Sequence, residues 1–231
     1  MRIDIITIFP EMFEAVFRFG IVRRAQEAGL LTVQVHDLRD WTRDRHRSTD
    51  DAPYGGGPGM VMRVEPLVEA VEAVTDSYGT SPEGRLKVLL SPRGVPLSQA
   101  MLKQMAAMEH LVLVAGRYEG VDERFTRLAG AEEISIGDYV LSGGEIPAMV
   151  VVDAVTRWLP GAISDPASAE EDSFNHGLLD FPHYTRPAEY RGLKVPEVLL
   201  SGDHAAVRRW REEQALAQTR ARRPELISSE G

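Results

Sequence analysis

The segment from Ile134 to Gly161 constrains the fold most, because ISIGDYVLSGGEIPAMVVVDAVTRWLPG joins a strand end, a glycine turn and an apolar helix. Gly137 is expected to end the strand. Gly143–Gly144 is expected to form a turn whose backbone can take positive φ and approach a ligand closely. A helix is predicted from Glu145, since this carboxylate complements the positive end of a helix dipole.

Apolar residues recur within this helix at three- and four-residue steps, and Pro160–Gly161 is expected to stop it. Asp153 and Arg157 fall one turn apart on another face. Taken alone, the segment is explained by a buried helix that carries a surface ion pair.

The chain has 231 residues, enough for one large core or for one core and a small satellite domain. It contains no cysteine, which excludes disulfides, thiolate metal sites and cysteine nucleophiles. A net charge of −9 argues against indiscriminate nucleic-acid binding, and no DNA partner is expected. The opening residues have no signal-peptide layout and AMVVVDAV is too short to span a bilayer, so a cytoplasmic protein without a membrane partner is expected.

The order of the predicted elements favours an α/β fold. Strands at Ile3–Phe9 and Leu31–Val35 flank helical segments, and this strand–helix–strand pattern predicts a parallel sheet. The further predicted elements are helices at Val64–Val74, Leu97–Met108 (capped by Ser98) and Val121–Leu128, and strands at Lys87–Leu90 and Leu111–Ala115.

Three of the predicted strands run into tight loops, within LLSPRG, VAGRYEG and ISIGDYVLSGG. The SPRG segment is expected to be a sharp turn. Ligands of open parallel sheets bind outside the carboxyl ends of the strands, so these loops are the predicted pocket.

An irregular segment, RDWTRDRHRSTDDAPYGGGPGM, is too long for an idle connector. Its cations, Arg43 and His46 among them, together with its glycines could hold phosphates or a nucleoside. The alternative is a solvated loop with local ion pairs to its aspartates. No Walker-type or G-x-G-x-x-G phosphate motif is present.

The C-terminal part is predicted to be a separate, mostly helical domain. Residues 1–160 form the predicted main domain, 161–173 a flexible linker and 174–231 the helical domain. Ser201–Asp203 is expected to begin a helix from His204 that carries a basic cluster including Arg208, Arg209 and Arg211. This cluster would supply phosphate contacts to RNA, or it is a solubilising face.

Four motifs in order, PYGGGPGM (53–60), GRYEG (116–120), SIGDYVLSGGE (135–145) and EDSF (171–174), resemble the bacterial tRNA (guanine-N1)-methyltransferases of the SPOUT superfamily. The similarity covers nearly the whole chain. It implies a parallel-sheet SPOUT domain with a deep trefoil knot, a homodimer with its pocket at the subunit interface, and S-adenosylmethionine as methyl donor. The implied substrate is the guanosine at position 37 of tRNAs in which a guanosine precedes it.

Methylation of guanine N1 requires removal of the N1 proton while negative charge builds on O6, so a base and a cation are needed. The resemblance assigns these roles to Asp172 and Arg157. It also implies Mg²⁺ recruitment through Glu119, although one carboxylate is no metal site by itself and the histidines show no ligand spacing. The donor-binding residues that it implies are Leu90, Pro92, Gly116, Tyr118, Glu119, Gly120, Ile136, Gly137, Asp138, Tyr139, Val140, Leu141, Gly143 and Gly144.

Two other functions remain open from the sequence. A non-catalytic RNA-binding module would use the basic helix and would need no donor pocket. Another SPOUT enzyme, acting on ribosomal RNA or on ribose, would bind the same donor and differ in the methylated atom.

Overall fold

The computed structural model describes residues 1–228, and the chain divides into two compact units. The first covers Met1–Ser164 and the second begins at Asp165. The first unit is an α/β domain and the second is mainly helical, as the sequence predicts.

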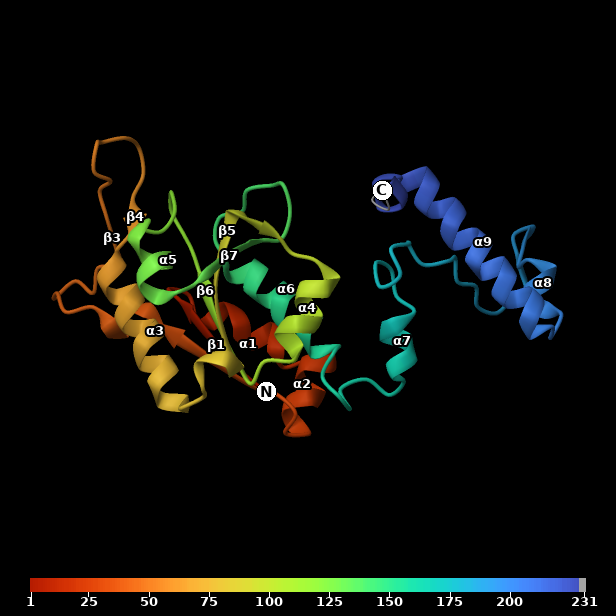
Figure 1. The fold of residues 1–231 in the computed structure, drawn as a ribbon, viewed down its shortest axis with the longest axis horizontal. Coiled ribbons are helices and arrows are strands. Elements are labelled where there is room, and N and C mark those ends of the chain that lie inside the picture. The colour runs from red at the N-terminus through yellow and green to blue at the C-terminus, as the bar shows by residue number, and fades with distance from the viewer. Residues whose placement is uncertain (229–231) are drawn as a thin grey trace. The chain divides into compact units, whose positions relative to one another are not determined.

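The first unit is built on a five-stranded sheet in the order β2-β1-β6-β5-β7 (Figure 1). Every neighbouring pair of strands is parallel, which confirms the predicted sheet type. The bounds are β1 Arg2–Thr7, β2 Thr32–Asp37, β5 Arg85–Pro96, β6 His110–Ala115 and β7 Glu132–Ser135.

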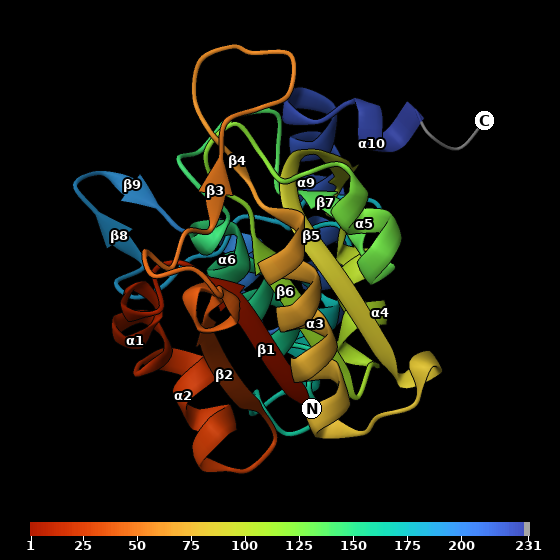
Figure 2. The same cartoon turned by 90° about the vertical axis from the view of Figure 1, so that its left-hand side faces the viewer.

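Helices cover both faces of this sheet (Figures 1 and 2). One face packs against α1 Glu11–Phe17, α2 Gly20–Glu27, α4 Gln99–Ala106 and α6 Glu145–Thr156. The other packs against the 3-10 helix η1 Leu38–Trp41, α3 Val64–Tyr78 and α5 Arg124–Ala129. The short elements are β3 Asp50–Asp51, β4 Val61–Met62 and the 3-10 helix η2 Pro82–Gly84.

The central strand β6 shows why this part of the chain folds as a buried strand. Leu111 and Leu113 enter the core on one face, while Val112 and Val114 enter the core on the other. Side chains alternate between the faces of a strand, so a continuous apolar run suits a parallel sheet that is covered on both sides.

The predicted turn at SPRG is wrong, because β5 continues through it to Pro96. The strand is irregular there: Leu90 and Val95 both pair with Ile134. A Cβ at Gly94 would lie 2.3 Å from the Ile134 nitrogen, so glycine lets the extra residues bulge while the two backbones stay in contact.

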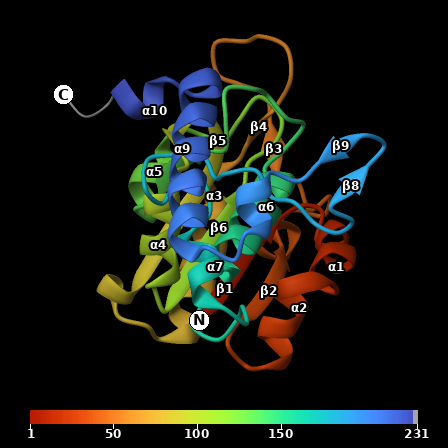
Figure 3. The ribbon, with the colours of Figure 1, turned by 90° about the vertical axis from the view of Figure 1, so that its right-hand side faces the viewer.

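The second unit contains α7 Pro166–Glu170, β8 Glu189–Tyr190, β9 Leu193–Lys194, α8 Glu197–Leu200, α9 His204–Arg222 and α10 Glu225–Ser228 (Figure 3). The start of α9 is as predicted, since the Asp203 carboxylate accepts hydrogen bonds from the backbone N–H groups of Ala205 and Ala206, both at 3.0 Å. The β8–β9 hairpin was not predicted. Nor was α7, which lies inside the segment predicted as a linker.

Candidate functional site

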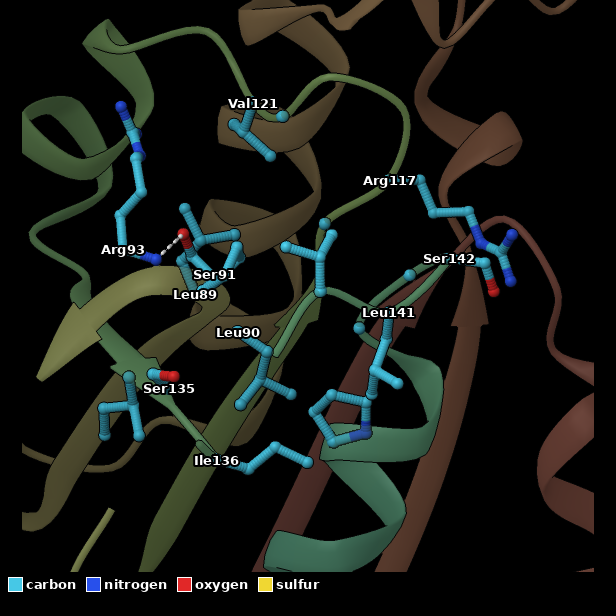
Figure 4. A pocket seen from close by; sticks show the side chains of 18 of the residues that line it. Leu89, Leu90, Ser91, Arg93, Arg117, Val121, Ser135, Ile136, Leu141 and Ser142 are labelled. Carbon is cyan, nitrogen blue, oxygen red and sulfur yellow. Dashed lines mark hydrogen bonds between the residues drawn. The ribbon is translucent and has the colours of Figure 1, made fainter. Parts of the chain in front are cut away.

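A pocket lies at the carboxyl edge of the sheet, where the segments after β6 and β7 meet the irregular part of β5 (Figure 4). All of the predicted donor-binding residues except Asp138 line it. Asp138 is exposed beside it. The lining residues that the sequence did not single out are Leu89, Ser91, Arg93, Arg117, Val121, Ile134, Ser135, Ser142 and Pro147.

The walls of the pocket are largely apolar. Leu90 and Ile134 belong to paired strands, and Ile136 and Leu141 come from the loop that follows β7. Figure 4 shows Leu90 on β5, and Ile136 and Leu141 on the loop that follows β7. Apolar walls with a few polar groups are typical of pockets that hold a small molecule.

Two backbone contacts fasten the loops together. The Gly144 N–H donates to the Gly116 carbonyl at 2.8 Å, and Arg117 forms an antiparallel bridge with Gly143. A Cβ at Gly144 would lie 2.7 Å from the Ala115 Cα. These glycines therefore allow two loops to touch along their backbones.

Gly143–Gly144 does not use the positive φ that glycine allows. Neither residue is in the left-handed region, and Gly144 has φ −81°. The sequence pattern located the turn, but the glycines serve close backbone approach and not an unusual dihedral angle.

Gly137 does use the conformational freedom of glycine, at φ +150°. Its N–H donates to the Ser135 hydroxyl at 3.2 Å, and the Tyr139 hydroxyl donates to the Ile136 carbonyl at 3.2 Å. A Cβ at Gly137 would lie 2.5 Å from the Tyr139 ring. The strand ends here as predicted, and the turn places the next residues along the pocket.

A buried ion pair lies at the start of α6. Glu145 is 1 % exposed and accepts hydrogen bonds from the Thr7 hydroxyl at 2.9 Å and from Arg117 Nε at 3.0 Å. The Arg117 guanidinium also lies 4.4 Å from the centre of the Phe9 ring. A buried carboxylate needs such partners, and here they join the end of β1, the GRYEG loop and α6.

Arg93 was also missed by the sequence analysis. Its Nη2 lies 3.1 Å from a Glu123 carboxylate oxygen and 3.2 Å from one of Glu133. The hydrogen bond to Glu123 and the charge of Glu133 raise the pKa of Arg93. The Arg93 N–H donates to the Ser91 hydroxyl, the contact dashed in Figure 4.

The PYGGGPGM segment, which joins β3 to β4, is attached to the same pocket. Glu119 donates its N–H to the Met60 carbonyl at 3.0 Å, and Met62 donates to the Gly120 carbonyl at 2.9 Å. A Cβ at Gly59 would lie 2.5 Å from the Glu119 side chain. Two of the motifs that carry the family resemblance thus meet at one wall.

Tyr118, in the same loop, has φ +60°, unusual for a residue with a side chain. Burial, and then the charge of Asp50, raise the pKa of its hydroxyl. Tyr118 therefore lines the pocket as a neutral phenol at ordinary pH.

The two predicted catalytic residues belong to different units. Arg157 is half-buried and follows the last residue of α6 in the first unit. Asp172 belongs to the second unit, where it lines a pocket together with Arg208 and Arg211 of α9. The structure thus brings the predicted base beside two of the three predicted RNA-binding arginines of α9. Arg209 is exposed on the same helix.

The other two predicted RNA-binding residues, Arg43 and His46, are exposed and do not line the donor pocket. Arg43 Nη2 lies 2.8 Å from a Glu69 carboxylate oxygen, and Arg47 pairs with Asp40. The Arg47–Asp40 pair is a local ion pair of the solvated-loop alternative, whereas Arg43 pairs with a residue of α3.

Two features are absent from the part of the chain that the structure describes. Between residues 1 and 228 no group of three or more histidine, aspartate or glutamate side chains is arranged to hold a metal ion, so the Mg²⁺ expectation has no ligand cluster to support it. No helix in the same range is both long and apolar enough to cross a membrane.

Comparison with known proteins identifies the family. Residues 1–229 match the model of the family described as tRNA (Guanine-1)-methyltransferase TrmD. The chain belongs to this family. A tRNA (guanine-N(1)-)-methyltransferase of Pelotomaculum thermopropionicum is 54 % identical over 231 residues, which cover 100 % of this chain and 91 % of that protein. One of Methylococcus capsulatus is 56 % identical over 228 residues, covering 99 % and 90 %. One of Pseudomonas putida is 55 % identical over 229 residues, covering 99 % and 90 %.

Membership of the family fixes the superfamily as SPOUT, as the motifs indicated. The trefoil knot stays a prediction. The individual site residues stay predictions as well, although nearly all of the donor-binding set lines one pocket.

Proposed function

We propose that this protein transfers a methyl group from S-adenosylmethionine to N1 of the guanosine at position 37 of tRNA. One observation carries the proposal: two of the motifs that carry the family resemblance, GRYEG and SIGDYVLSGGE, line a single pocket at the carboxyl edge of the sheet. A non-catalytic RNA-binding module would have no use for such a pocket.

The pocket fits the methyl donor in its chemistry. Leu90, Ile136 and Leu141 supply apolar surface for an adenine ring, and the backbone of the loops around Gly116 and Gly137 supplies polar groups at its edge. The donor, when bound, supplies an electrophilic methyl group carried on a sulfonium.

Asp172 and Arg157 are the proposed catalytic residues. The Asp172 carboxylate accepts the N1 proton of the guanine as the methyl group is transferred to N1, which leaves S-adenosylhomocysteine as product. Arg157 donates hydrogen bonds to O6, where negative charge builds. Arg157 belongs to the first unit and Asp172 to the second.

The second unit is proposed to hold the tRNA. Arg208 and Arg211 line the pocket that contains Asp172, so one surface would supply both the phosphate contacts and the general base. Proteins usually read RNA sequence in unpaired loops whose bases can be splayed out, and a guanosine beside the anticodon is such a base.

A homodimer is proposed as the working form. The first unit exposes a group of apolar side chains on the adjoining helices α1 and α6: Met12, Val16, Ile146 and Val150. Exposed apolar side chains that lie together mark an interaction surface. A second copy of the chain, with the same surface, is the proposed partner.

The deciding experiment is a methylation assay with unmodified tRNA, followed by mass mapping of the product. Methyl transfer to N1 of guanosine 37 is the expected result, with no transfer to a tRNA that carries adenosine at that position. Methyl groups found only on ribosomal RNA or on ribose would identify another SPOUT activity. Donor binding without any transfer would contradict the proposal for Asp172 and Arg157.

Mixed dimers test whether one site uses both subunits. If donor pocket and base come from different subunits, Asp172→Ala subunits mixed with donor-defective Gly143→Val subunits will form heterodimers with one intact site. Each heterodimer should then show up to about half of the wild-type rate, the share of one independent site of two. Verified heterodimers as inactive as either parent would show that each site is built within one subunit.

A further inference from the structure

The second unit contains an apolar groove that none of the proposed roles uses. It runs between the segment around residues 181–188 and the helices α8 and α9. The residues that line it are Phe181, Pro182, His183, Tyr184, Thr185, Arg186, Ala188, Val195, Leu199, Leu200, Val207, Trp210 and Arg211.

Aromatic rings and a guanidinium form one side of this groove. The rings of Tyr184 and Trp210 lie with their centres 6.2 Å apart, inclined at 54°. The Arg211 guanidinium lies 4.7 Å from the centre of the Phe181 ring, and the His183 ring lies 4.6 Å from that of Phe181. Planar groups from two segments of the chain are therefore presented together.

These side chains are not a closed core. Tyr184 is 49 % exposed and Leu200 is 61 % exposed, although both line an otherwise apolar groove. Exposure of apolar surface to water is unfavourable in free energy, and a contiguous exposed apolar surface often marks a binding site. The exposed side chains of this groove therefore point to a ligand.

The groove also adjoins the pocket of the proposed base. Phe181, Val207 and Arg211 line both cavities, so Asp172 is separated from the aromatic groove only by shared walls. A nucleotide chain that places one residue at Asp172 would carry its neighbour toward Tyr184 and Trp210.

We propose that this groove binds an unstacked base of the tRNA loop that lies near the guanosine presented to Asp172. The inference rests on the proposed function. Aromatic side chains and arginine planes are the surfaces on which RNA-binding proteins stack splayed bases. The positive charge of Arg186, Arg208 and Arg211 around the two cavities suits the phosphates on either side of such a base.

Tyr184 is the residue to test, because its half-exposed ring can be removed with little effect on folding. Tyr184→Leu keeps an apolar side chain without the ring, and Tyr184→Phe keeps the ring. Tyr190→Leu is the matched control, since Tyr190 is 61 % exposed in the same unit and does not line the groove. Trp210→Phe and Trp210→Leu form a second pair, and thermal melting checks that each full-length variant folds.

The probe is the anticodon stem-loop RNA, intact or with one abasic nucleotide at each loop position in turn. Tyr184→Leu should weaken binding of the intact RNA by about 5- to 150-fold, the equivalent of one stacked base, and Tyr184→Phe should restore it. The salt dependence of binding should not change, since stacking releases no counterions. One abasic position should weaken binding to the wild type but cause no further weakening in Tyr184→Leu.

Three results would overturn the groove assignment: wild-type affinity in both Tyr184→Leu and Trp210→Leu, an equal reduction of affinity in Tyr190→Leu, or additive reductions at every abasic position. A shift from dimer to monomer in Tyr184→Leu would show that the groove receives the second subunit and would also overturn it. If the groove assignment fails but the wild type still methylates tRNA in the methylation assay described above, the proposed function survives. If the wild type neither binds nor methylates tRNA, both proposals fail.

Discussion

The two ends of the parallel sheet differ in how they treat polar groups. Near the amino ends of the strands, Asp4 is fully buried, and hydrogen bonds reach it from His36 at 2.6 Å, His110 at 2.7 Å and Arg2 at 2.6 Å. At the carboxyl ends the pocket offers apolar walls, glycine backbone and few charged side chains. Both ends therefore satisfy a buried carboxylate, Asp4 near the amino ends and Glu145 at the carboxyl ends, and the carboxyl ends also form the pocket proposed for the donor.

The comparison shows that an altered pKa does not by itself mark the functional site. Burial opposes the ionisation of Asp4, but the hydrogen bonds from His110, His36 and Arg2 outweigh it and hold the pKa of Asp4 well below its usual range. These hydrogen bonds join residues of the fold to one another. The candidate active site is marked instead by geometry, namely three segments that meet where parallel strands end.

The largest difference is expected between substitutions of Asp172, the proposed general base, and of Asp4, the buried carboxylate near the amino ends of the strands. Asp172→Ala should slow single-turnover methyl transfer by about 10²- to 10⁴-fold, the usual contribution of a general base, and leave donor binding unchanged. Quench-flow measurements at saturating tRNA and donor give the rate, and calorimetry gives the donor affinity. An undiminished rate would remove Asp172 from the mechanism.

Asp4→Ala should act on stability and not on chemistry. Removal of one partner from a buried charged cluster leaves the others uncompensated, so the free energy of unfolding should fall by about 3–5 kcal/mol. Urea unfolding measures this decrease. In the fraction that remains folded, the single-turnover rate should equal that of the wild type, and a rate reduced as much as in Asp172→Ala would contradict the comparison.

The stabilisation by the ionised Asp4 carboxylate should depend on pH. The folded pKa of Asp4 is lowered, so the stabilisation from its ionised form is present above about pH 4, the unfolded value, and is lost as the pH falls toward the folded pKa. The gap in unfolding free energy between the wild type and Asp4→Asn should therefore narrow below about pH 4. A gap that widens on acidification would show that the charge of Asp4 does not stabilise the fold.

Glycine substitutions compare the two ends of the sheet directly. A Cβ at Gly143 would lie 2.5 Å from Arg117 Nε and from a Glu145 carboxylate oxygen, so Gly143→Ala must displace the side chains of the buried Arg117–Glu145 ion pair. Donor affinity should fall by about 5- to 150-fold, which corresponds to strain of about 1–3 kcal/mol. Gly84→Ala, just before β5 at the other end, is the control and should bind the donor as the wild type does.

The smallest effect is expected from surface charge. Simultaneous replacement of Arg208, Arg209 and Arg211 by glutamine should weaken tRNA binding and lower the slope of log affinity against log salt by about 0.7–0.9 for each phosphate that is no longer neutralised. Filter binding over a range of salt concentrations measures the slope. The same slope in wild type and variant would show that these arginines do not touch phosphate.

Local patterns in the sequence predicted much of the fold. Ser98 caps α4 by accepting a hydrogen bond from Met101, Asp203 caps α9, and Gly137 ends β7, each as predicted. These features depend on a few neighbouring residues, so the sequence is sufficient to find them. The β8–β9 hairpin was missed because strands of two residues are too short to show alternation.

Contacts between distant segments could not be found in this way. Asp4 meets a histidine 106 residues away, and Glu145 meets Thr7 across 138 residues. The neighbours of Gly143–Gly144 could not be found for the same reason, since only the folded chain shows the backbone of Ala115 against Gly144 and the Arg117 and Glu145 side chains against Gly143.

The sequence by itself determined the order of the elements, the parallel sheet, the glycine loops and, through its motifs, the family. Only the tertiary structure decided that β5 continues through its bulge, that Arg117 and Glu145 join the loops of the pocket, and that Asp172 shares a cavity with Arg208 and Arg211. The physical reason is the range of the interactions: helix caps, turns and hydrophobic periodicity act over a few residues, whereas pockets and buried charges depend on groups that folding brings together from far along the chain.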